Sequence, residues 1–529
     1  MSRSLDTTVP ARASRHAVPG TSRRRGLCRH GLTPLSAAVA VWLPLAAHGQ
    51  VWNTAAALEM STTVTDNGAL SENGAERSDL ITSLKPQVRI ARRGANFGFT
   101  AALSAELVNY ANHSEADRVL PAADVKLEST IVERLVFLDA SADVKSVESD
   151  PFQGLVDAAP GSNTDTVSTL RISPYLDYQI SPRLSLVARA DESLATTTQD
   201  ATPDRRSHQM FVRLSQKPLP LGAALELSRQ ATSYSEQSSD DLTTEAARLS
   251  LSYTLDGQFL VGAIVGQERN DFQGEKQSDA IAGLQFQWVP GPRTDLRARV
   301  EHRFFGTGWD LAFSHRTPFM TMAVAMNREP VGFSGISALA SDNDLNQYLD
   351  AILTTRYPDP VSRQAQVDEV INSRNLRTRF PEAVDTLSGY AQLRSRASAT
   401  LVWLGSRNTF SISGYSQTLR RLTRSDEPAA DPVDNISDSR QTGAAVEINR
   451  RLTPQMSLGA VAQWAKVVGL AARDGDESHE RSLRVSLSRN LSPRTTLAVG
   501  LQYRELRTTV AALNSYDETS GFAALSLRY

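Results

Sequence analysis

Apolar and polar side chains alternate along most of the chain, and this alternation limits the possible folds more than any other feature of the sequence. In one stretch Leu483, Val485 and Leu487 are separated by single serine or arginine residues. Residues 295–304 and 495–504 repeat the pattern. Because successive side chains of a strand point to opposite faces of a sheet, the alternation predicts strands with one apolar and one polar face.

Short breaks separate these runs at a regular interval. Pro182, Pro218, Asp256 and Pro292 stand about 36 to 38 residues apart, enough for two strands, one tight turn and one longer loop. Polar stretches between the turns, such as residues 270–278, are expected to form the longer loops. Tight turns are expected near residues 94, 132, 182, 218, 256, 292, 318, 405, 454 and 493.

This spacing decides between two all-β folds. Alternation alone would also fit a secreted β-sandwich, whereas tight turns on one rim and long loops on the other are typical of an outer-membrane barrel. The sequence therefore predicts a transmembrane up-and-down antiparallel β-barrel of about 22 strands, within a range of about 18 to 24. The tight turns are expected to face the periplasm.

The N-terminal segment has the order of a secretory signal peptide. Several arginines precede an apolar run over residues 32–47, and a small-x-small sequence ends at Gly49. We expect residues 1–49 to be cleaved before Gln50 during export, and residues 50–529 to form the barrel in the cell outer membrane. A short membrane anchor is the alternative, and two prolines inside the run disfavour it.

Charge and motifs argue against nucleic-acid binding and against catalysis. From Gln50 onward the formal net charge is about −8, so we expect no nucleic-acid partner. The single cysteine, Cys28, precedes Gln50, and the five histidines that follow have no ligand spacing. The sequence has no P-loop and no G-x-S-x-G or H-E-x-x-H motif. We expect no enzymatic activity, no catalytic residue, no cofactor and no metal site.

An insertion at about residues 330–386 interrupts the β pattern. Leu345, Leu349 and Ile352 have helical spacing, and Asp359 supplies an N-cap before a second helical stretch. By the turn count the insertion leaves the barrel at the outer, long-loop rim. Two placements are open: the helices enter the pore or close its mouth, or they form an outgrowth on the surface.

Arginines and carboxylates gather on the polar face of several predicted strands. If those strands close into a barrel, this face lines the lumen, and the paired charges would set the electrostatic field of the pore. Aromatic residues near strand ends, such as Trp288 and Trp403, suit the interfacial girdle of a barrel. The predicted pore-lining residues are Asp295, Arg297, Arg299, Glu301, Arg303, Arg484 and Arg504.

The last segment reads as a closing strand. Leu525, Leu527 and Tyr529 form its apolar row, and the strand is expected to pair with the first one, because an open sheet edge cannot lie in a bilayer. An alternating strand that ends on an aromatic residue resembles the C-terminal signal read by the outer-membrane assembly machinery. We therefore predict that these three residues act as that signal.

Two short motifs resemble a known family. Residues 288–294 (WVPGPRT) are followed by residues 303–306 (RFFG), and further matching pieces are spread over residues 52–410. Together they resemble the PEP-CTERM system-associated outer-membrane proteins. The resemblance implies an outer-membrane barrel from Gram-negative bacteria that carry exosortase and exopolysaccharide genes. It implies no established activity, and it assigns no catalytic residue to this chain.

These observations lead to one expected function and one alternative. We expect a porin-like channel or export conduit linked to exopolysaccharide and to PEP-CTERM protein sorting. The alternative is a non-conducting structural or adhesion barrel that anchors surface polysaccharide or protein. The expected partners are outer-membrane lipid and lipopolysaccharide, the outer-membrane assembly machinery, and exopolysaccharide.

Overall fold

The computed structural model describes most of the chain after the first fifty residues. Residues 1–49, to which the signal-peptide prediction applies, lie outside the described part. The described ranges are 52–148, 150–154, 164–198, 204–235, 242–272, 275–331, 344–384, 392–422, 438–511 and 513–529.

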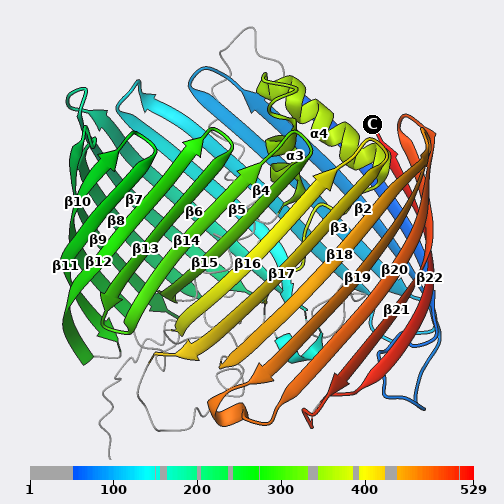
Figure 1. Cartoon of the computed structure of the whole chain (residues 1–529). Coiled ribbons are helices and arrows are strands. Elements are labelled where there is room, and N and C mark those ends of the chain that lie inside the picture. Colours follow the sequence, from blue (N-terminus) through cyan, green and yellow to red (C-terminus); the bar gives the residue numbers. More distant parts are fainter. Residues whose placement is uncertain are drawn as a thin grey trace, which may run out of the picture. The chain divides into compact units, whose positions relative to one another are not determined.

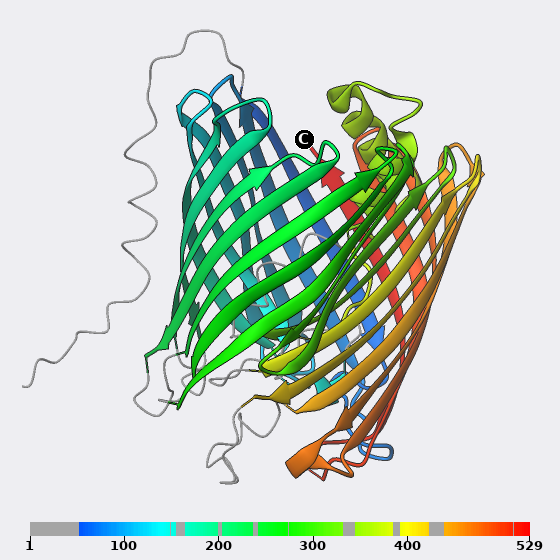
Figure 2. The same ribbon diagram turned by 60° about the vertical axis from the view of Figure 1, so that its left-hand side comes forward.

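Strands form one antiparallel sheet of 22 members that closes on itself (Figure 1, Figure 2). Each strand pairs with its neighbours in the chain, and β22 pairs with β1 over residues 520–528 and 57–65. The predicted all-β barrel, its strand number and its up-and-down order are confirmed. The strands are β1 (Asn53–Thr65), β2 (Asp79–Arg93), β3 (Phe97–Tyr110), β4 (Arg118–Val132), β5 (Val136–Glu148), β6 (Thr164–Gln179), β7 (Leu184–Thr197), β8 (Arg205–Gln216), β9 (Leu221–Tyr234), β10 (Leu242–Leu255), β11 (Phe259–Phe272), β12 (Glu275–Gly291), β13 (Thr294–Arg303), β14 (Gly306–Arg316), β15 (Met320–Val331), β16 (Gln392–Leu404), β17 (Asn408–Arg421), β18 (Ser439–Thr453), β19 (Met456–Gly469), β20 (Glu477–Ser492), β21 (Thr495–Thr508) and β22 (Tyr516–Arg528).

The barrel has two different rims. Each tight turn expected from the sequence connects an even-numbered strand to the next one, and we call this end the short-turn rim. The opposite end, where odd-numbered strands lead to even-numbered ones, is the long-loop rim. At this rim the prediction of a long loop at residues 270–278 was wrong, because β11 continues to Phe272 and β12 begins at Glu275. A strand that extends past the apolar band carries polar side chains on both faces, so its composition resembles that of a loop.

The two faces of the wall have opposite chemistry. Outward positions expose large apolar side chains, among them Leu284 and Leu501 at 68% and 67% exposure. Inward positions carry polar residues, such as Glu301 and Arg504, that interact across neighbouring strands. An apolar outer surface around a polar interior is the arrangement that a bilayer requires of a strand-built wall. Among the described residues, no helix is long and apolar enough to cross a membrane.

The predicted helices are confirmed within one loop, between β15 and β16. They are α3 (Leu345–Leu353) and α4 (Pro360–Arg374). The carboxylate of Asp359 accepts a hydrogen bond from the Ser362 backbone N–H at 2.9 Å and caps α4, which holds the pKa of that carboxyl below its usual range. The left-handed residue Asn375, at φ 51°, ends the helix. Two short 3-10 helices, η1 (Pro151–Gln153) and η3 (Ala471–Arg473), lie in other loops.

Candidate functional site

The insertion crosses the inside of the barrel. It leaves β15 at Val331 and enters β16 at Gln392, and both positions lie at the long-loop rim. Its helices nevertheless lie at the short-turn rim, at the same end of the barrel as the C-terminal end of β22 (Figure 1, Figure 2). The described part of the insertion, residues 344–384, therefore begins at the end of the barrel opposite to Val331 and Gln392 and runs back toward them after α4.

The two helices pack against the inner wall through an apolar core. Leu349, Ile352 and Val367 are almost completely buried, and they form one cluster with Val402 and Leu404 of β16. The two β16 residues occupy inward positions near the short-turn rim. Burying side chains of this size stabilises the packed state by about 1.5–3 kcal/mol each, so this core stabilises the docked helices.

A buried arginine fixes the end of α4 to a tight turn. The guanidinium of Arg374 donates to Thr409 Oγ1 at 2.6 Å and to the carbonyls of Gly405 and Ser406 at 3.1 and 3.3 Å. The amide of Asn449 donates to the Arg374 carbonyl at 2.7 Å. Burial lowers the pKa of Arg374, and the group stays charged because arginine titrates far above neutral pH. These charge-assisted hydrogen bonds hold the helix at the β16–β17 turn.

The return segment, residues 376–384, follows the inner wall from the short-turn rim toward the long-loop rim. Arg396 pairs with Glu382 at 2.7 Å. At Val384 the backbone N–H donates to Gln441 Oε1 at 2.8 Å, and the Val384 carbonyl accepts from Gln441 at 2.7 Å and from Gln417 at 3.3 Å. All the wall residues in these contacts occupy inward positions. Of the two placements that the sequence left open, the structure has the insertion inside the barrel.

We call the inward faces of β16 to β19, which the insertion covers, the filled wall. On β17 the inward residues from Thr409 to Leu419 are buried along the whole strand. Gln417 and Gln441 have no exposed surface at all. Polar side chains buried this deeply are tolerated because they hydrogen-bond to the insertion.

We call the inward faces of β4, β13 and β14 the open wall. In the middle of β4 the ion pair of Lys126 and Asp124 remains 58% and 57% exposed. On β14 the inward residues Asp310 and Ser314 are also exposed. Inward side chains in the middle of a barrel wall can be exposed only to a space inside it, so water reaches this side of the lumen.

Five of the predicted pore-lining residues lie together on β13. Arg297 pairs with Asp295 at 2.8 Å and is 64% exposed, and Arg299 lies 4.0 Å from Glu301. Toward the long-loop rim Arg303 is more enclosed. This group carries two carboxylates and three guanidinium groups along one strand of the open wall, so both cations and anions passing it would meet a complementary partner.

Two charged partners of this group, one arginine and one glutamate, come from β10 and β11, and sequence reasoning did not select them. Arg248 of β10 lies 3.3 Å from Glu301, and Glu268 of β11 pairs with Arg303 at 2.6 Å. Glu268 also accepts a hydrogen bond from the Phe304 backbone at 2.8 Å. Position on the polar face was the only available signal for Arg248 and Glu268, and it identifies a partner only after the strand register is known.

The other two predicted residues lie on a different part of the wall. Arg504 of β21 is 1% exposed and lies between Glu480 at 3.7 Å and Glu518 at 3.5 Å. Arg484 of β20 lies over the ring of Phe522 at 4.0 Å. Strands β14 to β19 separate both residues from the β13 group, so the structure does not bring the seven together.

The loop with η1 covers part of the wall beside Arg504. Phe152 is completely buried against Val467 and Val510, and the guanidinium of Arg473 lies 4.2 Å from the centre of its ring. Gly154, with φ 117°, stands next to Glu480, where an added Cβ would lie 3.4 Å from the carboxylate. A loop that starts at β5 thus reaches across to β19 and β20 and narrows the long-loop end.

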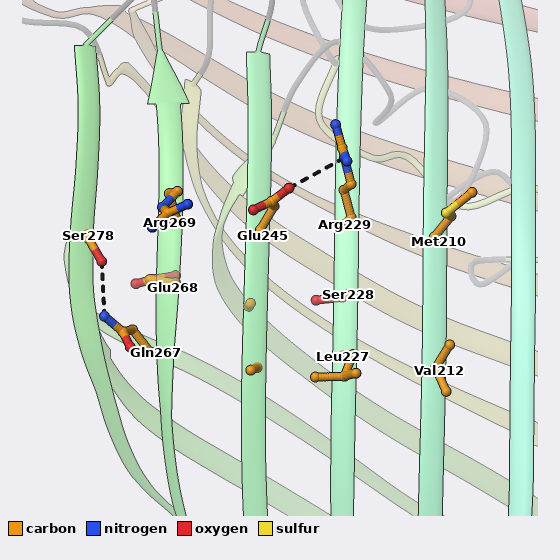
Figure 3. A pocket seen from close by; sticks show the side chains of 12 residues that line it. Met210, Val212, Leu227, Ser228, Arg229, Glu245, Gln267, Glu268, Arg269 and Ser278 are labelled. Carbon is orange, nitrogen blue, oxygen red and sulfur yellow. Dashed lines mark hydrogen bonds and ion pairs between the residues drawn. The ribbon is translucent and has the colours of Figure 1, made fainter.

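The outer surface has a shallow cavity of about 410 Å³ on β8 to β12 (Figure 3). Met210 and Val212 give it an apolar part. On neighbouring strands Arg229 pairs with Glu245 at 3.5 Å, and Gln267 donates to the Ser278 hydroxyl at 3.1 Å, as Figure 3 shows. The apolar band of the wall therefore gives way to a charged belt toward the long-loop rim, where polar lipid headgroups are expected. The paired residues of this part of the belt are Arg229, Glu245, Gln267 and Ser278.

The predicted C-terminal signal lies on the seam that closes the barrel. Leu525 and Leu527 occupy outward positions on β22, and Tyr529 is 71% exposed. The Tyr529 backbone N–H donates to the carbonyl of Ala56 at 2.8 Å. In the part of the chain that the structure describes, no group of His, Cys, Asp and Glu side chains is placed to hold a metal ion.

A closed antiparallel barrel with an apolar outside and a polar, partly filled inside defines the protein as an outer-membrane β-barrel. No protein-family model and no curated protein matches the chain. The resemblance to PEP-CTERM system-associated proteins therefore stays a prediction.

Several solved outer-membrane barrels are similar to the chain at low sequence identity. The FrpB iron transporter from Neisseria meningitidis aligns over 90% of this chain and 83% of its own, with 9% identity and a TM-score of 0.48. The siderophore receptor PirA from Pseudomonas aeruginosa aligns over 90% and 80%, with 7% identity and a TM-score of 0.43. OccK2 (OpdF) from Pseudomonas aeruginosa aligns over 90% and 98%, with 10% identity and a TM-score of 0.34.

Proposed function

We propose that the protein is an outer-membrane channel or export conduit in which solute passes along the open wall, beside the insertion. The observation that carries the proposal is the exposure of the Lys126 and Asp124 pair in the middle of β4. A barrel with this number of strands encloses a lumen wide enough to conduct unless something fills it. The insertion fills the side at β16 to β19, and the charged residues of β13 would face the passing solute.

A second candidate function is a closed structural or adhesion barrel that anchors surface polysaccharide or protein. The observation that favours it is the number of contacts that fix the insertion inside the lumen, from Arg374 at one rim to Val384 near the other. A segment held at both ends is suited to permanent closure. The two candidates make opposite predictions for ion flow.

Conductance in planar bilayers tests the proposal. The native protein is expected to give discrete current steps, and a variant with residues 332–391 replaced by a short hairpin turn is expected to give larger ones. Both proteins are first checked for folding by heat-modifiable migration on a denaturing gel. If both are folded and neither conducts, the channel proposal is wrong and the structural barrel takes its place.

We further propose that the barrel serves the export of exopolysaccharide or the sorting of PEP-CTERM proteins. The support is the pair of motifs at residues 288–294 and 303–306. Deleting the gene in its host should lower the amount of polysaccharide or sorted protein at the cell surface, and unchanged amounts of both would count against the link. Exosortase and glycosyltransferase genes beside this one are the genomic observation expected with it.

Assembly and lipid contacts complete the proposal. We propose that Leu525, Leu527 and Tyr529 are recognised by the outer-membrane assembly machinery, and that the charged belt of the outer face contacts lipopolysaccharide. Deleting Tyr529 should lower the fraction of the protein that is folded in the outer membrane, measured by heat-modifiable migration. The conductance of the molecules that do assemble should stay unchanged. Tyr178→Ala is a matched control, because Tyr178 is another exposed tyrosine on the outer face. Equal assembly of the two variants would contradict the signal.

A further inference from the structure

A cavity of about 420 Å³ lies at the short-turn end of β2 to β6. Its lining includes the turn at residues 93–98 together with Glu128, Phe137, Asp139 and Tyr175. These four side chains occupy inward positions on β4, β5 and β6, next to the exposed Lys126 and Asp124 pair. The volume falls within the range of about 300–1,000 Å³ that is usual for small-molecule sites.

The cavity contains a fixed aromatic surface. Phe137 and Tyr175 lie opposite each other in the β5–β6 register, and their rings stack with centroids 5.0 Å apart and an interplanar angle of 18°. The guanidinium of Arg189 lies 5.3 Å from the centre of the Tyr175 ring. A half-buried phenylalanine on a polar, water-facing wall is an apolar surface available to a ligand.

Charges of both signs surround the rings. Arg189 pairs with Asp139 at 3.2 Å and with Asp191 at 2.9 Å, while Glu128 is exposed toward the cavity and Arg93 lies at the rim. A cationic ligand on the ring stack would be repelled by Arg189, and an anionic one by Glu128 and Asp139. The site therefore favours an uncharged ligand that has one apolar face and several hydroxyl groups.

We propose that this cavity binds an uncharged saccharide segment. The C–H face of a sugar ring would pack on Phe137, and its hydroxyls would donate to the carboxylates of Glu128 and Asp139, which only accept hydrogen bonds. The Tyr175 hydroxyl and Arg93 would serve as donors. This proposal deepens the proposed function by naming the class of solute. It rests on that function only for the statement that the ligand is the solute that passes through the barrel.

A glycine keeps the space above Glu128 free. A Cβ built at Gly98 would lie 3.5 Å from the Glu128 carboxylate, which is an ordinary contact distance. A larger residue at this position would extend into the cavity without disturbing the backbone. Gly98→Leu is therefore a variant that blocks the site and leaves the ring stack and its charges in place.

Equilibrium binding to the folded, full-length barrel tests the proposal independently of ion flow. Isothermal titration calorimetry measures affinity for short linear oligomers of glucose, mannose, galactose and N-acetylglucosamine, with choline and oligogalacturonate as charged probes. Phe137→Leu is expected to weaken binding of the best oligosaccharide by about tenfold, and Phe137→Trp is expected to keep it. Glu128→Gln and Gly98→Leu should also weaken binding.

The matched control is Phe259→Leu. Phe259 stacks with Trp288 at 6.1 Å and 16°, but it belongs to the outer face near the same rim, so its loss should leave saccharide affinity unchanged. Tighter binding of choline or oligogalacturonate than of every neutral sugar would overturn the proposal. So would equal affinity of the native, Phe137→Leu and Gly98→Leu proteins, or no binding of any sugar. If the protein does not conduct but binds sugar in this way, the channel proposal is wrong and the proposal of a saccharide site stands.

Discussion

The filled wall and the open wall are both inward faces of the same sheet, and their sequences are alike in being polar. On β17 the inward residues between Thr409 and Leu419 are buried, whereas on β4 the inward residues from Ala122 to Glu128 are exposed. The difference lies in what covers each strand, since the insertion packs on one and not on the other. A polar inward row therefore becomes a pore lining only where no other part of the chain lies against it.

The same difference changes what a polar side chain contributes. On the filled wall each amide or guanidinium is shielded from water, so losing its partner leaves a buried group unsatisfied. On the open wall an ion pair such as Lys126 with Asp124 is solvated and contributes little to stability. Substitutions of the same chemical kind should therefore have unequal effects in the two regions.

The largest contrast is expected between two arginines from the predicted pore lining. Arg504→Ala removes the positive charge beside the buried Glu480 and Glu518 and should lower the free energy of unfolding by about 3–5 kcal/mol. Arg297→Ala removes an exposed pair and should change it by less than about 1 kcal/mol. Urea unfolding from lipid vesicles measures both values. Arg504 lies on β21, outside the filled wall, but it is buried as the polar residues of that wall are. Equal losses would show that burial of a polar inward residue does not decide its contribution to stability.

The core of the insertion should show the next largest effect. Leu349→Ala leaves a cavity beside Val402 and should lower the free energy of local opening of α3 by about 2–5 kcal/mol. Amide hydrogen exchange in α3 measures it. Val361→Ala is the control, because Val361 is 74% exposed on α4 and its change should stay within about 0.5 kcal/mol. Unchanged exchange in Leu349→Ala would show that the helices are not held by this core.

A smaller effect is expected at the anchor of α4. Arg374→Ala removes the hydrogen bonds to Thr409 and to the β16–β17 turn and should weaken docking by about 1.5–3 kcal/mol. Faster hydrogen exchange in α4 and noisier single-channel currents are the readouts. Arg356→Ala is the matched control, since Arg356 is exposed on the loop between the helices. If the control variant loosens α4 as much, the anchor assignment is wrong.

The smallest effect on stability, and the clearest on function, is expected on the open wall. Arg299→Glu reverses one exposed charge on β13 and should lower the free energy of unfolding by about 1 kcal/mol or less, because Arg248 still neutralises Glu301. Reversal potentials in a salt gradient should shift toward cation preference, because the lining loses a positive and gains a negative charge. An unshifted potential would place the ion path away from β13.

Much of the barrel could be predicted from the sequence because its signals are local. The tight turns, the strand number and the N-cap at Asp359 each depend on residues within a few positions of one another. The prediction of a loop at residues 270–278 was wrong for a related reason. Polar composition indicates contact with water, and a loop and a strand that extends beyond the membrane are both in contact with water.

The candidate site could be predicted only in part. The alternation of polar and apolar residues placed both the β13 residues from Asp295 to Arg303 and Arg504 of β21 on the polar face. It could not show that Arg504 is buried while Arg297 is exposed, because burial depends on which distant segments cover each strand. The ring pair of Phe137 and Tyr175 was missed because its members are far apart in the sequence and meet only through the β5–β6 register. Register is set by pairing along the whole strand.

The sequence by itself determined which residues form strands, which face each side chain takes, and that two helices interrupt the barrel, because each of these follows from periodicity and capping over a few residues. Only the tertiary structure decided that the insertion runs back through the lumen, and hence which polar face is filled and which is open. That decision depends on contacts such as Arg374 with Thr409 and Val384 with Gln441, which join residues distant in the chain.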